Sequence, residues 1–308
     1  MPDIVEDLSQ LIGNTPLLRL ERFAPEARAD LLAKLELFNP YSIKDRTVLS
    51  MVDDAEARGL LVRGGTVVEA TSGNTGLALA MLAAIRGYRC VLVMSAIQSV
   101  ERRQLLKALG AELVLTPKEG GTKAARKEAK RIAAETGAFY IGQHDNPANP
   151  RVHETQTAAE LWRQTDGRID ALVAGLGTGG TLVGVSRALK VLKPSFRTIG
   201  VEPESSPFIS QGVFRPHRLM GTAPGFRPGV LDDAHIDNIA LVSEEDAFAA
   251  CHRIARTEGL VVGISSGAVA VAAERLVADP AWAGKTVVCV FADSGQRYLS
   301  VEGLFPSA

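Results

Sequence analysis

The chain has 308 residues, of which 46% are hydrophobic and 22% charged, and 34 Lys and Arg against 35 Asp and Glu leave a formal net charge of −1. This composition is that of a globular protein with enough apolar material for one large domain or two ordinary ones. The balanced charge, without a long block of one sign, gives no indication of a nucleic-acid or membrane partner.

The N-terminal decapeptide MPDIVEDLSQ is acidic and lacks the apolar core of a signal peptide, and no apolar run is long enough to span a bilayer. We therefore expect a cytoplasmic protein. The three cysteines, Cys90, Cys251 and Cys289, are far apart and show neither a disulfide framework nor metal-binding spacing. Because Cys90 and Cys289 lie in apolar runs, we expect buried free thiols and no metal site.

Short β-rich runs alternate with helical patterns through the first half of the chain. We expect strands at 66–69, 90–94, 112–116 and 139–142, and helices at 75–86, 99–109 and 122–136. Glycine follows each of these helices, where a left-handed residue ends a helix without steric cost. Such an alternation predicts a parallel sheet covered by helices.

The alternation restarts after the segment 146–150 (NPANP), which we interpret as a crossover between two lobes. Helices are expected at 153–164, 179–192, 243–257 and 266–278, and strands at 171–175, 198–202 and 286–292. Ser243 and Asp246 are placed as a capping box. The region 203–231 is rich in Pro and Gly and long for a structureless loop, which indicates a functional segment.

Lys44, in the segment 42–46 (SIKDR), precedes an amphipathic helical pattern. A lysine forms an imine with a carbonyl compound only where its amine can lose its proton, so a catalytic Lys44 would have to lie in a pocket. The segment taken alone is more typical of an ordinary surface helix start.

The loop 71–76 (TSGNTG) follows a predicted strand and opens a helix. Free backbone N–H groups and the helix dipole make such a position an anion site, and its hydroxyl and amide side chains add donors. A simple Ser or Thr cap would explain one of these polar residues but not four, so we favour the anion site.

The segment 175–181 (GLGTGGT) also joins a strand to a helix. Its amides and two threonine hydroxyls suit one phosphate group. Gly175, Gly177 and Gly180 also form the dinucleotide fingerprint, with Glu202 as the acidic residue further along. The interleaved threonines favour the single phosphate. Ser265, in the segment 263–267 (GISSG), suits a helix cap, and the sequence alone gives no reason to prefer a ligand role.

Taken together, these segments resemble the cysteine synthase family, the fold type II pyridoxal-phosphate enzymes that include O-acetylserine sulfhydrylase and the catalytic core of cystathionine β-synthase. The resemblance extends over nearly the whole chain. The matching segments are 12–17 (IGNTPL), 39–40, 42–46, 71–76, 101–102, 146–150, 177–181, 216–217, 225–226, 263–267 and 295–299 (GQRYL).

The resemblance implies an α/β fold of two three-layer αβα lobes with mostly parallel sheets, similar to the tryptophan synthase β chain. It implies a smaller, mobile substrate-loop domain at 39–149 and a larger domain, 1–38 plus 150–308, that binds the cofactor phosphate. The implied reaction is β-replacement on an activated serine, most directly O-acetyl-L-serine plus sulfide giving L-cysteine plus acetate. A homodimer is also implied, and docking of serine acetyltransferase stays open.

The resemblance also assigns roles to individual residues. Lys44 holds pyridoxal 5′-phosphate and later moves the Cα proton, Asn74 contacts the 3′-oxygen of the cofactor, and Ser265 faces its pyridine nitrogen. The cofactor phosphate is assigned to Gly177, Thr178, Gly179, Gly180 and Thr181. The substrate is assigned to Thr71, Ser72, Gly73, Asn74, Thr75, Gln143 and Gly221.

Two segments depart from the usual family pattern, Ala96 to Ser99 and Met220 to Phe226, and His144 replaces a common aromatic residue. They surround the part of the site that selects substrates and leave donor and nucleophile open. O-phosphoserine, homocysteine and an amine are alternatives, and Arg215, Arg218 and Arg227 favour an anionic leaving group unless they are ordinary surface residues. A dinucleotide-dependent dehydrogenase and a catalytically silent binding or regulatory homologue remain as alternatives of other classes.

Overall fold

The computed structural model describes residues 4–71, 73–96 and 100–305. The chain forms two compact units, unit 1 from Met1–Ile12 and Pro40–Asn149, and unit 2 from Gly13–Asn39 and Pro150–Ala308. The break at 149–150 lies in the segment expected to be the crossover. The segment ending at Ile12, which we expected in the larger domain, belongs to unit 1 because Ile12 packs against the apolar core of that unit.

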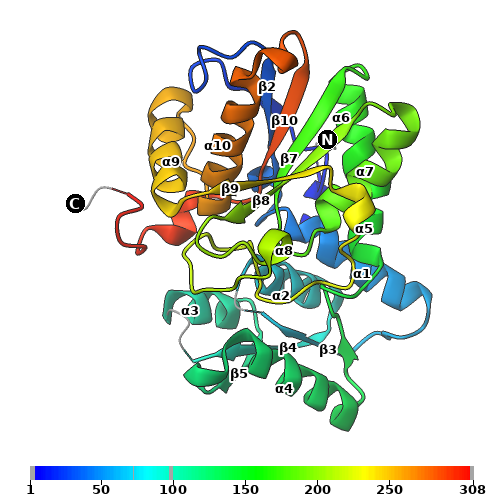
Figure 1. Ribbon diagram of the computed structural model, residues 1–308. Helices are drawn as coiled ribbons and strands as arrows, with labels where there is room; N and C mark the ends of the chain where they lie inside the picture. Colours follow the sequence, from blue (N-terminus) through cyan, green and yellow to red (C-terminus); the bar gives the residue numbers. More distant parts are fainter. Residues whose placement is uncertain (1–3, 72, 97–99, 306–308) are drawn as a thin grey trace. The chain divides into compact units, whose positions relative to one another are not determined.

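Unit 1 contains a parallel four-stranded sheet in the order β5–β4–β3–β6 (Figure 1). Val67 of the sheet packs with α1 and α2, whereas Val68 packs with Ala125 and Ala129 of α4. Because successive strand residues point to opposite faces, this alternation places helices on both sides of the sheet. The elements are α1 (Lys44–Ala57), β3 (Thr66–Ala70), α2 (Asn74–Arg86), β4 (Arg89–Ser95), α3 (Val100–Ala108), β5 (Glu112–Thr116), α4 (Gly121–Thr136) and β6 (Phe139–Tyr140).

Unit 2 contains a six-stranded sheet in the order β1–β2–β10–β7–β8–β9, parallel except for the β1–β2 pair. Helices α9 and α10 cover one face, and α6 and α7 cover the other (Figure 1). The expected two αβα lobes with mostly parallel sheets are thereby confirmed. The elements are β1 (Leu17–Arg19), β2 (Asp30–Leu35), α5 (Ala148–Val152), α6 (Ala158–Gln164), β7 (Ile169–Gly175), α7 (Gly180–Leu192), β8 (Arg197–Pro203), α8 (Phe208–Gln211), β9 (Asn238–Val242), α9 (Glu244–Glu258), α10 (Ile264–Ala278) and β10 (Thr286–Phe291).

The helix expected at 153–164 begins five residues earlier, at Ala148. The side-chain oxygen of Asn146 accepts the Ala148 N–H at 3.0 Å and caps the helix, and Pro150 is tolerated in the first turn because an N–H there has no helical partner. The turn His153–Thr157 is a π-helix. A Cβ on Gly184 of α7 would lie 2.1 Å from the Pro150 oxygen, so only glycine permits this close packing.

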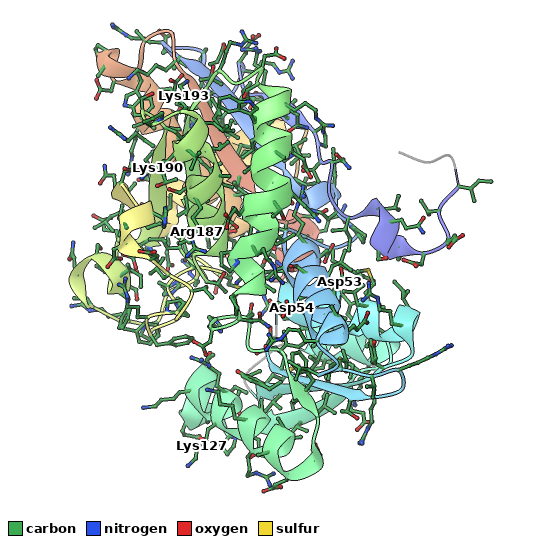
Figure 2. All side chains as sticks on the ribbon, turned by 90° about the vertical axis from the view of Figure 1, so that its right-hand side faces the viewer. Asp53, Asp54, Lys127, Arg187, Lys190 and Lys193 are labelled. Atoms are coloured by element: carbon green, nitrogen blue, oxygen red, sulfur yellow. The ribbon has the colours of Figure 1, made fainter. Side chains whose placement is uncertain are left out.

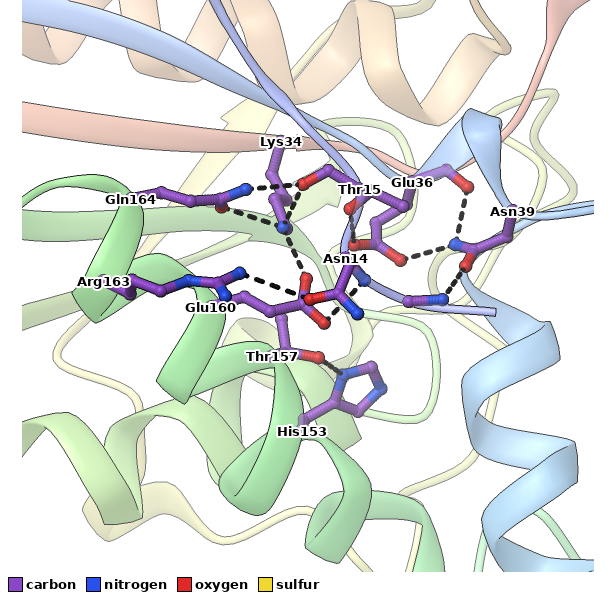
Figure 3. Close-up of polar contacts among 11 residues, drawn as sticks. Asn14, Thr15, Lys34, Glu36, Asn39, His153, Thr157, Glu160, Arg163 and Gln164 are labelled. Carbon is purple, nitrogen blue, oxygen red and sulfur yellow. Dashed lines mark hydrogen bonds and ion pairs between the residues drawn. The ribbon is translucent and has the colours of Figure 1, made fainter. Parts of the chain in front are cut away.

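A buried polar network joins the loop 13–15 to β2 and α6 (Figure 3). The Lys34 amine lies 2.6 Å from a Glu160 carboxylate oxygen and 2.6 Å from the Thr15 carbonyl oxygen, and the Asn14 N–H donates to the same carboxylate at 2.9 Å. Lys34 is fully buried and Glu160 nearly so. Their pairing is what allows a lysine to occupy the buried part of this strand, whose other residues, 31–33 and 35, are apolar.

Arg187, Lys190 and Lys193 follow one another along the end of α7 (Figure 2). Lys190 pairs with Asp237 at 2.9 Å and Lys193 with Asp170 at 2.8 Å. Two of these three cations therefore hold the end of the helix against neighbouring segments of the sheet.

The three cysteines are buried free thiols, as expected for Cys90 and Cys289. Burial raises the pKa of the Cys90 and Cys251 thiols to about 12, so both stay protonated and unreactive at neutral pH. Within the described residues, no cluster of three metal-ligating side chains occurs. No helix in the described part of the chain is both long and apolar enough to cross a membrane.

Candidate functional site

In unit 1, two loops leave the same edge of the sheet. The loop beginning at Thr71 follows β3, and the loop carrying Gln143 follows β6, the parallel neighbour of β3. The carboxyl ends of parallel strands are where ligands bind in α/β sheets. The topology therefore brings these two predicted segments together, although 68 residues of sequence separate Thr75 from Gln143.

Lys44 is the first residue of α1 and is partly buried. Its N–H donates to the Ser42 hydroxyl at 3.1 Å, while a carboxylate oxygen of Asp45 accepts the N–H groups of Tyr41 and Ser42 at 2.7 and 3.0 Å. These contacts fix the backbone before the helix and hence the direction in which the Lys44 side chain leaves it. The apolar face of α1, with Val48, Met51, Val52 and Ala55, is fully buried.

The first residues of α2 place side chains and amides at one end of that helix. Asn74 is its first residue, partly buried, and Thr75 is buried. The Thr75 hydroxyl donates to the side-chain oxygen of Gln143 at 2.7 Å. Thr71 and Gly73 form the preceding turn, where the Gly73 N–H lies 3.3 Å from the Thr71 hydroxyl oxygen. Ser72, also assigned to the substrate loop, lies outside the described residues, as do 97–99 of the departing segment.

Two titratable groups beside these loops have strongly shifted pKa values. Burial raises the pKa of Glu69, at the end of β3, to about 7, against the lowering effect of backbone N–H donors. Burial lowers the pKa of His144 to about 4, and the nearby charges of Arg126 and Lys44 lower it further. The imidazole is therefore neutral near pH 7. Glu69 had no role assigned from the sequence, although an acidic residue within a predicted strand of apolar residues is the pattern that marks it.

In unit 2, residues 177–181 form a glycine-rich turn between β7 and α7. Gly179 has φ +82°, and a Cβ there would lie 2.5 Å from Leu231, so the turn requires glycine. Thr178 and Gly180 are buried and Thr181 is partly buried at the start of a 13-residue helix. Helix N–H groups and two hydroxyls are gathered here, the chemistry that holds a phosphate. His153 adds to this group, with its Nε2 3.3 Å from the Thr181 hydroxyl.

The segment around Gly221 packs directly over this turn. A Cβ on Gly177 would lie 2.4 Å from the Gly221 carbonyl oxygen, and the Ala223 N–H donates to the Leu176 carbonyl at 2.9 Å. Gly221 itself is exposed and has φ +89°. The structure thus places Gly221 next to the glycine-rich turn, within the irregular region 203–231.

Ser265 lies in the first turn of α10 and is partly buried. The cap residue of this helix is Gly263, whose N–H donates to the Asp293 carbonyl at 3.0 Å, so the Ser265 hydroxyl is not the cap. Its neighbour Ser266 accepts the Ala292 N–H at 3.0 Å. Since Ala292 and Asp293 follow β10, the neighbour of β7, Ser265 and the glycine-rich turn lie at the same edge of the unit 2 sheet.

Both carboxylate oxygens of Glu202 are used in hydrogen bonds within the fold, which argues against the dinucleotide-binding alternative. It is fully buried, and its two carboxylate oxygens accept the N–H groups of Ile209 and Ser210 at 2.6 and 3.0 Å. A dinucleotide site needs this carboxylate for a ribose hydroxyl. In this chain it caps the short helix α8 instead.

Two of the three arginines considered for an anionic leaving group are engaged in ion pairs. Arg218 pairs with Glu244 at 2.7 Å and lies over the Phe248 ring, and Arg227 pairs with Asp233 at 2.6 Å. Their positions are explained by these contacts. Arg215 is exposed.

Residues 8–293 match the family model described as pyridoxal-phosphate dependent enzyme. The chain is 46% identical over 298 residues to a cysteine synthase of Staphylococcus aureus, covering 96% of each protein. The crystal structure of O-ureido-L-serine synthase has 44% identity and a TM-score of 0.93, covering 97% of this chain and 95% of the other. The cysteine synthase of Entamoeba histolytica has 36% identity and a TM-score of 0.94, covering 100% and 94%.

Proposed function

The chain belongs to the pyridoxal-phosphate dependent enzyme family, and from this premise we propose that it transfers a nucleophile to the β-carbon of an activated L-serine. The favoured reaction is O-acetyl-L-serine plus sulfide giving L-cysteine plus acetate. The observation that carries the proposal is the 46% identity to a cysteine synthase over nearly the whole of both chains.

The residues present fit pyridoxal phosphate. Gly179 leaves no room for a side chain and has a left-handed backbone, so the turn 177–181 presents amides and hydroxyls at the start of α7. We assign the cofactor phosphate to Gly177, Thr178, Gly179, Gly180 and Thr181. Lys44 would bind the cofactor covalently, Asn74 would contact its 3′-oxygen, and Ser265 would face its pyridine nitrogen.

When bound, the cofactor supplies an electron sink that accepts the electron pair left when the Cα–H bond of the amino acid loses its proton. Lys44 then serves as the base at Cα. The neutral hydroxyl of Ser265 stabilises a positive ring nitrogen less than a carboxylate would.

The substrate carboxylate is assigned to the loop of Thr71, Ser72, Gly73, Asn74 and Thr75, together with Gln143. The N-terminus of α2 favours an anion, and the Thr75 hydroxyl and the Gln143 amide are already joined at 2.7 Å. Holding the carboxylate there orients the Cα–H bond towards the base, a proximity effect. Gly221, exposed beside the glycine-rich turn, is assigned to the substrate entrance.

A second candidate reaction follows from the 44% identity to O-ureido-L-serine synthase. Its named product carries an oxygen-linked ureido group on serine, so the corresponding nucleophile would be the oxygen of hydroxyurea in place of sulfide. The departures at Ala96 to Ser99 and Met220 to Phe226 leave the nucleophile open, which makes this second reaction a candidate. Two alternatives vary the substrates within the same chemistry, namely O-phosphoserine as donor and a cystathionine β-synthase-like reaction with homocysteine.

One titration series tests these assignments. The purified protein should show a visible absorption band of lysine-bound pyridoxal phosphate, which should shift with O-acetylserine and return with sulfide. Return with hydroxyurea but not with sulfide would favour the second candidate, and a response to O-phosphoserine alone would change the donor. A band that no donor shifts would favour the catalytically silent homologue, and absence of the band after adding cofactor would contradict the proposal.

Replacing Thr75 with valine should raise the KM for the amino-acid donor by about 10- to 100-fold, because the hydroxyl that holds the Gln143 side-chain oxygen is lost, and with it the fixed position of the amide assigned to the charged carboxylate, while the shape is kept. The cofactor band should remain. Thr75→Ser, which keeps the hydroxyl, is the matched control and should stay near the wild-type KM. Loss of the cofactor band in the valine variant would mean that this loop binds the cofactor phosphate.

A homodimer is part of the proposal and is checked by light scattering of the eluted protein. A cytoplasmic location, mobility of the smaller domain and docking of serine acetyltransferase also remain predictions. Docking would be measured by adding purified serine acetyltransferase and following competition with the amino-acid donor.

A further inference from the structure

Glu69 is a fully buried carboxylate at the point where the unit 1 sheet ends. β6 pairs with β3 only through Phe139 and Tyr140, and the Ile141 N–H donates to the Val68 carbonyl at 3.1 Å. The chain then turns away at Gly142, which has φ +64°. We expected a strand over 139–142, and the left-handed Gly142 is why the ladder stops earlier.

Beyond the end of the β3–β6 ladder, the side chain of Glu69 accepts the backbone N–H groups. The Gln143 N–H donates to one carboxylate oxygen at 3.2 Å, and the Ala70 N–H donates to the other at 2.9 Å. The Gly142 N–H is a further donor to this carboxylate. One side chain thus binds backbone N–H groups of β3 and of the loop that follows β6.

These contacts connect Glu69 by hydrogen bonds to the residues assigned to the substrate carboxylate. Glu69 holds the backbone of Gln143, and the side chain of Gln143 accepts the Thr75 hydroxyl at 2.7 Å. Asn149 adds a second hold, because its side-chain N–H donates to the Gln143 carbonyl at 2.8 Å. The position of the Gln143 side-chain amide therefore depends on Glu69, which holds the backbone N–H of the same residue.

We propose that Glu69 is a positioning residue for recognition of the substrate carboxylate, acting through Gln143. This inference rests on the proposed function. The ionised carboxylate of Glu69 accepts N–H groups at both oxygens. A protonated Glu69 would instead direct its O–H towards one of these N–H groups. Substrate binding should therefore weaken when Glu69 gains a proton.

The charged and titratable groups beside Glu69 come from β6, from the loop after it and from α4. Tyr140 of β6 has its pKa raised to about 12 by burial, and His144 of the adjoining loop has its pKa lowered to about 4 by burial. Arg126 of α4 is a guanidinium that pairs with Asp145 at 3.0 Å. Burial raises the pKa of Glu69 to about 7, so the change in substrate affinity belongs in this range.

Glu69→Gln tests the proposal because it keeps the shape but places an NH₂ group opposite a backbone N–H. The KM for the amino-acid donor should rise about 5- to 30-fold with little change in kcat and with the cofactor band retained. In a Gln143→Ala background the same substitution should have no further effect on KM, since the side chain that it positions is gone. Glu112→Gln, on the exposed edge strand β5, is the control and should match the wild type.

Equal effects of Glu69→Gln in the two backgrounds, or a wild-type KM, would overturn the proposal. If Glu69→Gln does not fold, donor affinity is measured against pH in the wild type and in Gln143→Ala. The ionisation of the donor is common to both proteins, so only the wild type should lose additional affinity as the pH falls through about 7. Identical pH profiles would overturn the proposal. Absence of cofactor binding or turnover in the wild type would instead contradict the proposed function.

Discussion

Lys44→Ala is expected to abolish turnover and the visible band of the bound cofactor. The loss of a positioned proton-transfer group alone lowers a rate by about 10²- to 10⁴-fold, and loss of the covalent attachment adds to it. Lys44 begins α1 in a segment fixed by Ser42 and Asp45, so alanine leaves the helix start intact. The measurement is β-replacement under saturating donor together with an absorption spectrum.

The matched control is Lys127→Ala. Lys127 lies exposed on α4 (Figure 2), so this variant loses a lysine of the same unit without touching either loop at the sheet edge. It should keep both the band and the rate of the wild type. Turnover surviving in Lys44→Ala would refute the assignment of Lys44 as the cofactor-binding base.

Lys34→Met is expected to destabilise unit 2 by about 3 to 5 kcal/mol, because removing one partner of a buried ion pair leaves the other charge without compensation. Glu160 would keep the Asn14 N–H but lose the amine at 2.6 Å (Figure 3). Both tryptophans, Trp162 and Trp282, belong to unit 2, so their fluorescence in a urea titration reports on this unit.

Lys190→Met is the control for this substitution, since Lys190 pairs with Asp237 nearer the surface and its removal should change stability by about 1 kcal/mol or less. Adding Glu160→Leu to Lys34→Met should recover part of the lost stability, because no unpaired charge would then be buried. Equal urea midpoints for Lys34→Met and Lys190→Met would show that the buried pair contributes no more than the surface pair.

Sequence patterns predicted the elements whose signals are local. Glycines such as Gly87 and Gly137 end helices with left-handed backbone, and the Ser243 hydroxyl accepts the Asp246 N–H at 3.0 Å as the capping box requires. The start of the helix at Ala148 was missed because its cap, Asn146, stands within a Pro-rich segment that we interpreted only as a crossover. β2 was not predicted, since Lys34 interrupts its apolar run.

The sequence by itself determined the alternation of strands and helices, the two polar loops at strand ends and the resemblance that assigns Lys44 its role. These follow from backbone preferences and residue order, which act over a few neighbouring positions. The tertiary structure decided what depends on contacts between distant segments. Lys34 contacts Glu160, 126 residues further along the chain, and Glu69 contacts Gln143, 74 residues further along. In both cases the fold supplies a hydrogen-bond partner to a buried ionisable side chain. A buried charge is stable only where the fold supplies compensating groups, and such groups cannot be identified from the residues next to it in sequence.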